Sequence, residues 1–255
     1  MKRLLTGLLL VPTFTYVILL APEWLFTLVV VLIAAACYHE YHGIASGYGV
    51  TWPEPAALLA GLVLLIAPSA HTEIITLFCL AAMGFSICSA SLAQCLPRAA
   101  LSLLGVVYVF GGWRTSILLR AASPYWLFFA TTINWVGDTA AYYTGRVAGR
   151  HRMAPVISPA KSWEGAIASL AASLIYGYFL LGWALPQVTP WRVLLLAAAG
   201  NVAGQVGDLA ESALKRGAGV KDSGNLLPGH GGWLDRVDST LFSMPVVLLL
   251  LQVLR

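Results

Sequence analysis

Long apolar stretches recur along the whole of this 255-residue sequence, and they constrain its fold more than any other feature. Apolar residues make up 59% of the chain and charged residues 10%, whereas a soluble domain carries about 25% charged residues. Many stretches are long enough to cross about 30 Å of hydrocarbon as helices. Backbone polar groups are satisfied in lipid only within helices or closed barrels, and the strict alternation of a barrel strand is absent from the sequence. The sequence therefore predicts an all-α integral membrane protein.

The apolar stretches predict about nine transmembrane helices, at residues 4–20, 23–40, 56–70, 73–91, 99–119, 124–146, 164–184, 191–213 and 239–255. Lys2 and Arg3 precede the first stretch, as they would in a signal peptide. No small-residue cleavage site follows before Glu23, so we expect this stretch to remain in the protein as a helix.

Basic residues concentrate on one side of this predicted topology. Nine helices place eleven of the fifteen Lys and Arg residues on the side of the N-terminus, and leave Arg114, Arg120, Arg192 and Arg255 elsewhere. By the positive-inside rule, the richer side is the cytoplasm. We therefore expect a multi-pass protein of the bacterial cytoplasmic (inner) membrane, with the 147–163 and 214–238 loops in the cytoplasm and the C-terminus on the opposite face.

The polar residues lie mostly in the second half of the chain. We expect residues 1–97 to form a transmembrane scaffold and residues 98–255 a transmembrane catalytic region, without a separate soluble domain. Four cysteines lie in or beside apolar stretches without paired metal-ligand spacing, and we interpret them as packing residues: Cys37, Cys79, Cys88 and Cys95.

The first polar cluster recurs every four residues, which places its members on one helix face: Asn134, Asp138, Tyr142 and Arg146. A carboxylate within an apolar helix is costly, so Asp138 should face the bundle interior, a cation or a water-filled cavity. Pairing with a neighbouring helix is the structural alternative.

The second cluster is the basic loop 149–165, which contains Ser158, Lys161 and Ser162. Ser162 is placed to cap the N-terminus of the following helix. The free N–H groups and positive dipole end of such a helix favour a phosphate. Alternatively, the basic residues of this loop serve only as topology determinants that face anionic lipid heads.

The third cluster is a polar stripe with spacings of four, three, four and three residues: Asn201, Gln205, Asp208, Ser212 and Lys215. Such spacing places the side chains on one face of a helix. Small residues around the stripe are typical of close helix packing in membranes. A purely structural Asp208 would need a buried base as its partner.

A glycine-rich segment with acidic and basic residues follows at 215–240. Glycines allow a backbone to wrap a phosphate, Lys and Arg neutralise it, and carboxylates are hard oxygen ligands for Mg²⁺. These are the components that nucleotidyl transfer requires. Taken singly, Asp235 or Asp238 is also explained as a helix cap, and His230 as a hydrogen-bonding loop residue.

From Ser212 through Asp238 the sequence resembles the phosphatidate cytidylyltransferase family. The family's signature runs from Ser-x-apolar-Lys-Arg through Pro-x-His-Gly-Gly to Asp-Arg-apolar-Asp. The segments 138–146 and 158–165 also resemble that family. Trp233 stands where a smaller aliphatic residue is usual, and Ala160 replaces a commonly basic residue. These departures concern the shape of the nucleotide or lipid pocket and remove no candidate ligand.

The resemblance implies an active site at the cytoplasmic membrane interface, where CTP and phosphatidate give CDP-diacylglycerol and pyrophosphate. It implies that Asp208 and Asp238 hold Mg²⁺, with K⁺ as a companion cation, and that Lys215 and Arg216 join them as catalytic residues. The substrate-binding residues would be Asp138, Ser158, Lys161, Ser212, Lys221, His230 and Arg236. Asp222 and Asp235 are either ligands or outer carboxylates. The expected partners are the two substrates, membrane lipids and, in a homodimer, a second copy of the chain, without nucleic acid.

Two other functions fit part of the pattern. A transporter or channel would account for Asp138 and the polar stripe, but not for the crowding of bases, glycines and carboxylates in one segment. A cytidylyltransferase that uses another lipid phosphate or nucleotide is a closer alternative, because the residues indicate phosphate and metal chemistry without specifying a base or an acyl chain.

Overall fold

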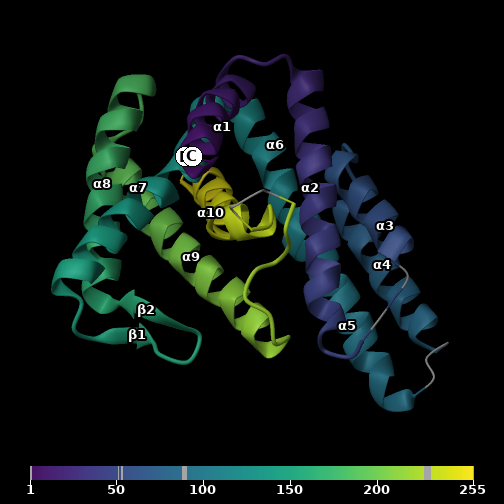
Figure 1. Cartoon of the computed structure of the whole chain (residues 1–255). Helices are drawn as coiled ribbons and strands as arrows, with labels where there is room; N and C mark the ends of the chain where they lie inside the picture. Colours follow the sequence, from purple (N-terminus) through teal and green to yellow (C-terminus); the bar gives the residue numbers. More distant parts are fainter. Residues whose placement is uncertain (1, 51, 53, 88–90, 227–230, 255) are drawn as a thin grey trace. The chain divides into compact units, whose positions relative to one another are not determined.

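The computed structural model of the chain describes residues 2–50, 52, 54–87, 91–226 and 231–254, with only the backbone described for residues 2–10. Figure 1 labels its α-helices and strands. The elements are α1 (Lys2–Leu19), α2 (Glu23–Ser46), α3 (Glu54–Ile66), α4 (His71–Ser86), η1 (Leu92–Gln94), α5 (Cys95–Gly105), η2 (Val106–Gly111), α6 (Gly112–Ala122), α7 (Pro124–Ala148), β1 (Arg152–Ala154), β2 (Ser158–Ser162), α8 (Trp163–Ala184), α9 (Pro190–Gly217) and α10 (Leu234–Val253). The described chain is therefore mostly helical, as predicted.

The lengths and compositions of the helices define a multi-pass membrane protein. Five helical stretches are long and apolar enough to cross a membrane: Glu23–Ser46, Leu92–Ala122, Trp163–Ala184, Pro190–Gly217 and Leu234–Val253. Each of the nine predicted ranges coincides largely with a helix. However, α3 and α4 have 13 and 16 residues, fewer than the roughly 20 that span the hydrocarbon. Nine membrane crossings therefore remain a prediction.

Two local features differ from the sequence-based expectation. The helical stretch 92–122 contains a π-helical segment, η2, between α5 and α6, and such segments are rare. The expected loop 147–163 contains a short antiparallel hairpin, in which Arg152 pairs with Ser162 and Ala154 with Ser158. The hairpin has strands of three and five residues, too short for an alternating pattern to be read from the sequence.

The chain forms two compact units that interleave along the sequence. Unit 1 comprises Met1–Leu4, Pro22–Arg114 and Leu214–Arg236; unit 2 comprises Leu5–Ala21, Thr115–Ala213 and Val237–Arg255. The predicted division into a scaffold (1–97) and a catalytic region (98–255) concerns function and remains a prediction.

In unit 1, glycines allow helices to pack against buried aromatic rings. A Cβ at Gly61 of α3 would lie 2.0 Å from the ring of Phe110 in η2, and one at Gly105 would lie 2.3 Å from the ring of Tyr41. The Tyr41 hydroxyl donates to the Leu101 carbonyl at 2.9 Å. Both aromatic residues are almost fully buried, so these close approaches join α2, α3 and the α5–η2 helix around one core.

In unit 2, α7, α8 and α9 are joined by small and polar residues. A Cβ at Gly137 of α7 would lie 2.4 Å from Ser169 Oγ and 2.6 Å from Asn201 Nδ2. Asn201 donates to the hydroxyls of Ser169 and Ser173 at 2.9 Å each. Small residues that allow hydrogen bonds between helices are characteristic of packing in membranes.

Arg120 caps the end of a helix, and Cys37 and Cys95 fit the expected packing role. Arg120 donates to the carbonyls of Ile18 and Ala21, at and just beyond the end of α1, whose last carbonyls have no partner within the helix. Cys37 is fully buried, and the Cys95 thiol donates to the Ser86 carbonyl at 3.2 Å. Cys88 lies outside the described residues.

Candidate active site

The predicted site residues fall into both compact units. Unit 2 contains Asp138, Ser158, Lys161, Asp208, Ser212 and Asp238, and unit 1 contains Lys215, Arg216, Lys221 and Arg236. His230 lies outside the described residues.

A polar pocket of about 360 Å³ in unit 2 is formed by α7, the hairpin, α8 and α9. Three predicted site residues, Asp138, Lys161 and Asp208, line it together with Gln205. Ala160, where the resembled family commonly has a basic residue, also lines the pocket. The pocket therefore joins three polar clusters that are far apart in the sequence.

The central contact of this pocket is an ion pair. Lys161 Nζ lies 2.6 Å from Asp208 Oδ2, and the two side chains are 28% and 30% exposed. Ser212, one turn further along α9, donates to Asp208 Oδ1 at 3.4 Å. Because both charged groups are accessible, a ligand can reach the lysine and the carboxylate without unfolding the pocket.

Lys161 is positioned by the junction between β2 and α8. Ser162 Oγ accepts a hydrogen bond from the Gly165 amide at 3.2 Å, which confirms the predicted N-cap. The ladder pairing of Arg152 with Ser162 holds the same end of the strand. Ser158 lies at the other end of β2. Backbone pairing and the N-cap therefore fix the backbone on both sides of Lys161, the positively charged residue of the pocket.

Asp238 approaches α9 in the first turns of α10. Its carbonyl oxygen would lie 2.8 Å from a Cβ at Gly207, so only a glycine allows this approach next to Asp208. Asp238 Oδ1 accepts from the Ser239 amide at 2.6 Å and from the Ser239 hydroxyl at 3.3 Å. Asp138 is close enough to Asp208 and Asp238 for their negative charges to act on it.

These carboxylates create a negative region opposed by the Lys161 ammonium. Within the described part of the chain, no group of three or more His, Cys, Asp or Glu side chains is arranged as a ready-made metal site. Mg²⁺ commonly uses one or two protein carboxylates and takes its remaining oxygens from substrate phosphates and water. The donor types of this region therefore fit a magnesium ion whose coordination is completed by a phosphorylated substrate.

Part of the predicted polar stripe has a structural role instead. Asn201 is buried and bonded to α8, and Gln205 donates to Asn201 Oδ1 at 2.7 Å and to the Ala166 carbonyl at 3.3 Å. In the first cluster, Asn134 donates to Ser243 Oγ at 2.8 Å. These amides join helices. Gln205 also lines the pocket, together with Asp138 and Asp208, which lie one turn beyond Asn134 and two turns beyond Asn201.

Unit 1 contains a buried ion pair between Lys215 and Asp235. The Lys215 Nζ to Asp235 Oδ1 distance is 2.5 Å, and the two side chains are 9% and 7% exposed. The ammonium of Lys215, which the sequence predicts to bind phosphate, thus forms an ion pair with a carboxylate of the protein. Arg216, the next residue, is exposed and donates to the Val220 carbonyl at 3.0 Å.

The remaining predicted residues of this segment are accessible. Lys221, Asp222 and Arg236 are all exposed. Asp235, unlike the exposed Asp222, has several hydrogen-bond donors within the protein. In addition to Lys215, its Oδ2 accepts from the amides of Ser223 and Gly232 at 2.9 Å each. Asp235 therefore organises its own segment.

Glu40 of α2 is a buried carboxylate that the sequence patterns did not single out. Its carboxylate is 4% exposed and accepts hydrogen bonds from Ser223, Trp233 and Leu234. The signal that identified Asp138, a carboxylate in an apolar helix, also applies to Glu40, which lies at the end of the predicted range 23–40.

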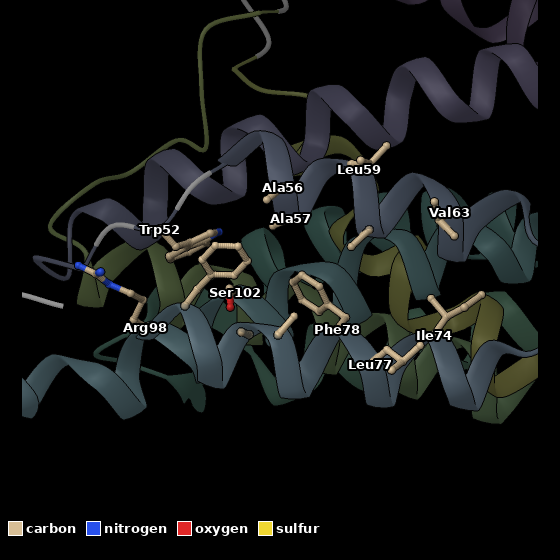
Figure 2. Close-up of a pocket in the computed structure, with 14 residues that line it drawn as sticks. Trp52, Ala56, Ala57, Leu59, Val63, Ile74, Leu77, Phe78, Arg98 and Ser102 are labelled. Atoms are coloured by element: carbon tan, nitrogen blue, oxygen red, sulfur yellow. The ribbon is translucent and has the colours of Figure 1, made fainter. Parts of the chain in front are cut away.

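An apolar groove of about 410 Å³ lies elsewhere in unit 1, lined by residues of α3, α4 and α5 (Figure 2). Figure 2 shows Trp52 and Arg98 near one end and Val63 and Ile74 near the other. The residues described around this groove include no carboxylate. The groove therefore offers no carboxylate for a metal ion among the residues that line it, and Arg98 gives it a positive charge at one end.

The fold and the pocket define a multi-pass helical membrane protein whose accessible Lys and Asp side chains suit a phosphorylated ligand and its cation. The chain belongs to the cytidylyltransferase family, because the model of that family matches residues 1–254. A phosphatidate cytidylyltransferase of Staphylococcus aureus is 37% identical over 198 residues, which cover 75% of this chain and 76% of the relative.

Two further relatives with the same name match a shorter part of the chain. The Staphylococcus haemolyticus protein is 42% identical over 153 residues, 60% of this chain and 59% of the relative. The Staphylococcus saprophyticus protein is 40% identical over 156 residues, 61% of this chain and 60% of the relative. The chain thus matches about three fifths of the length of these two relatives.

Proposed function

We propose that this protein is a phosphatidate cytidylyltransferase, which transfers CMP from CTP to phosphatidate and releases pyrophosphate. The observation that carries the proposal is the accessible Lys161–Asp208 pair in a pocket shared with Asp138, in a chain that matches the cytidylyltransferase family almost throughout. The relatives named phosphatidate cytidylyltransferase support this choice of substrates.

In the proposed reaction, a phosphatidate phosphate oxygen attacks the α-phosphorus of CTP. A new P–O–P linkage forms between phosphatidate and the α-phosphorus. The bond from the α-phosphorus to the oxygen that bridges the α- and β-phosphates of CTP breaks, and its electron pair leaves on pyrophosphate. The attacking phosphate is already ionised near neutral pH, so the step needs neither a general base on the protein nor a covalent enzyme intermediate.

Asp208 and Asp238 would hold Mg²⁺, with K⁺ as a companion cation, and the metal would stabilise charge on the reacting phosphates. Gly207 supports this role, because the backbone of Asp238 lies against the residue that precedes Asp208. Asp138 would bind substrate through this metal region. Lys161, whose ammonium lies beside Asp208, would bind a substrate phosphate.

Arg216, Lys221 and Arg236 are exposed and would neutralise the triphosphate or the departing pyrophosphate, with Ser158, Ser212 and His230 as further contacts. Lys215 would act mainly through Asp235, to which it is bound, and thereby position Arg216. This assignment differs from the direct phosphate contact that the sequence favours for Lys215.

The site would lie at the cytoplasmic face of a bacterial inner membrane, because CTP is a cytosolic nucleotide and basic residues concentrate on that side. Anionic lipid heads at the same surface would attract the basic 149–165 loop. We retain a homodimer as part of the proposal, to be tested by the mass of the purified protein in detergent.

The test uses the purified full chain in mixed micelles with Mg²⁺, CTP labelled at the α-phosphate, and a panel of lipid phosphates. We expect label in a lipid product with phosphatidate, together with one pyrophosphate per product. Transfer only to another lipid phosphate would replace the substrate assignment. No transfer to any lipid, combined with solute flux in proteoliposomes, would favour a transporter.

A further inference from the structure

The Glu40 carboxylate lies against the segment that connects α9 to α10 in sequence. Ser223 Oγ donates to Glu40 Oε2 at 2.9 Å, and the Leu234 amide donates to the same oxygen at 2.8 Å. The Trp233 amide donates to Oε1 at 3.0 Å. An ionised carboxylate that is 4% exposed would be costly without such partners, so these three donors explain how it is accommodated.

One of these donors, the Leu234 amide, is the first of α10, and the Trp233 amide immediately precedes it. The first amides of a helix have no acceptor within the helix, and a negative charge beside them is favourable because of the helix dipole. Glu40 therefore caps α10 from another helix, α2. Because α10 begins at Leu234, the cap fixes the start of the helix that carries Arg236 and Asp238.

The cap is continuous with the Lys215–Asp235 ion pair. Ser223 Oγ, which donates to Glu40, also accepts from the Asp235 amide at 3.3 Å. Asp235 in turn accepts from the Ser223 and Gly232 amides and from Lys215. Two carboxylates and one hydroxyl thus link the end of α9 to the start of α10.

The glycines of this segment are shaped to the Glu40 side chain. A Cβ at Gly232 would lie 2.3 Å from Glu40 Oε2, and one at Gly224 would lie 2.8 Å from Glu40 Oε1. Any other residue would push against the carboxylate. Two glycines of the signature segment are therefore explained by contact with Glu40 as well as by the general need of a flexible turn.

We propose that Glu40 is a positioning residue of the nucleotidyl-transfer site, which holds residues 223–226 and 231–234 so that Arg216 and Arg236 of the same unit keep a fixed geometry toward a polyphosphate substrate. The proposal rests on the proposed function. Glu40 itself does not bind phosphate, because its charge is negative and its oxygens already accept protein donors.

The experiment compares Glu40→Gln with Glu23→Gln, which makes the same change at an exposed position of the same helix. The NH2 group of glutamine cannot accept a hydrogen bond, so at least one of the three donors loses its partner. On protein shown to be folded and monodisperse in detergent, we expect Glu40→Gln to lower kcat/KM for CTP by about 10-fold to 100-fold, since small displacements of reacting groups have effects of this size.

A second variant approaches the same contact from the other side. Gly232→Ala should give the same kinetic defect as Glu40→Gln, whereas Gly43→Ala in α2, where a Cβ meets nothing within 4 Å, should leave kcat/KM unchanged. Hydrogen–deuterium exchange at the Trp233 and Leu234 amides gives a readout that is independent of activity. Exchange of at least one of these two amides should become at least about tenfold faster in Glu40→Gln, since one of the two acceptor oxygens of the cap is lost.

Each outcome decides a separate statement. Unchanged exchange at Trp233 and Leu234 would overturn the proposed cap whether or not the enzyme is active. Faster exchange with wild-type kcat/KM per folded molecule would reduce Glu40 to a stabilising residue and overturn its positioning role. If wild-type protein transfers no CMP, the proposed function fails and the positioning role fails with it, while the exchange data still decide whether Glu40 caps α10.

Discussion

Replacement of Lys215 by Met tests whether the buried ion pair with Asp235 holds unit 1 together. The substitution keeps most of the apolar side chain but leaves Asp235, whose side chain is 7% exposed, without its cation. Removing one partner of a buried pair costs about 3–5 kcal/mol. Because Asp235 keeps the amides of Ser223 and Gly232 as donors, we expect the lower end, about 3 kcal/mol.

A loss of about 3 kcal/mol changes an unfolding equilibrium by more than 100-fold and lowers the thermal midpoint by roughly 6–12 °C for a chain of this size. The assay is thermal unfolding of the detergent-purified protein, followed by intrinsic tryptophan fluorescence. Lys221→Met is the matched control, because Lys221 is exposed on the same segment and should change stability by no more than about 0.5 kcal/mol. Equal midpoints for Lys215→Met and wild type would refute the reasoning.

Three further outcomes are expected. Gly137→Ala should lower the thermal midpoint, since overpacking costs about 1–3 kcal/mol and its Cβ would lie 2.4 Å from Ser169 Oγ, whereas Gly182→Ala in α8 should have little effect because nothing lies within 4 Å. Lys161→Gln should reduce the rate of CMP transfer at least about tenfold. Its free energy of unfolding should change by no more than about 1 kcal/mol, because the ion pair of Lys161 is accessible. A fall in transfer that is fully explained by loss of folded protein would contradict this. Cysteines introduced at Arg150 and Lys221 should react with an impermeant reagent only from the cytoplasmic side; labelling from outside would overturn the topology.

The helices were predictable from the sequence because long apolar runs leave few alternatives in lipid. The pocket was partly predictable for a related reason: Asp138, Lys161 and Asp208 were each identified as charged groups in or beside apolar helices, and the structure brings them to one pocket. The N-cap at Ser162 was also predictable, since capping depends on neighbouring residues only.

The roles of the amides and of Lys215 were not predictable in the same way. A periodic stripe shows which residues share a helix face, but not which helix they meet, so Asn201 could not be separated from Asp208 by spacing. The partners of Lys215 and Glu40 depend on the path of the chain between α9 and α10. Asp235 is 20 residues from Lys215, and Ser223 is 183 residues from Glu40, distances over which periodicity carries no information.

The central claim is that Asp208 and Asp238 hold the cation that acts on the phosphates. It is tested most directly by CMP transfer across a magnesium titration with Asp208→Asn and Asp238→Asn, on protein confirmed to be folded in detergent. Asn keeps the size and one oxygen but removes the charge, so we expect each variant to lose at least about 100-fold in kcat and to need more Mg²⁺, while Asp222→Asn, at an exposed position, stays near wild type. Near-normal transfer with an unchanged magnesium requirement in both variants would contradict the proposed site.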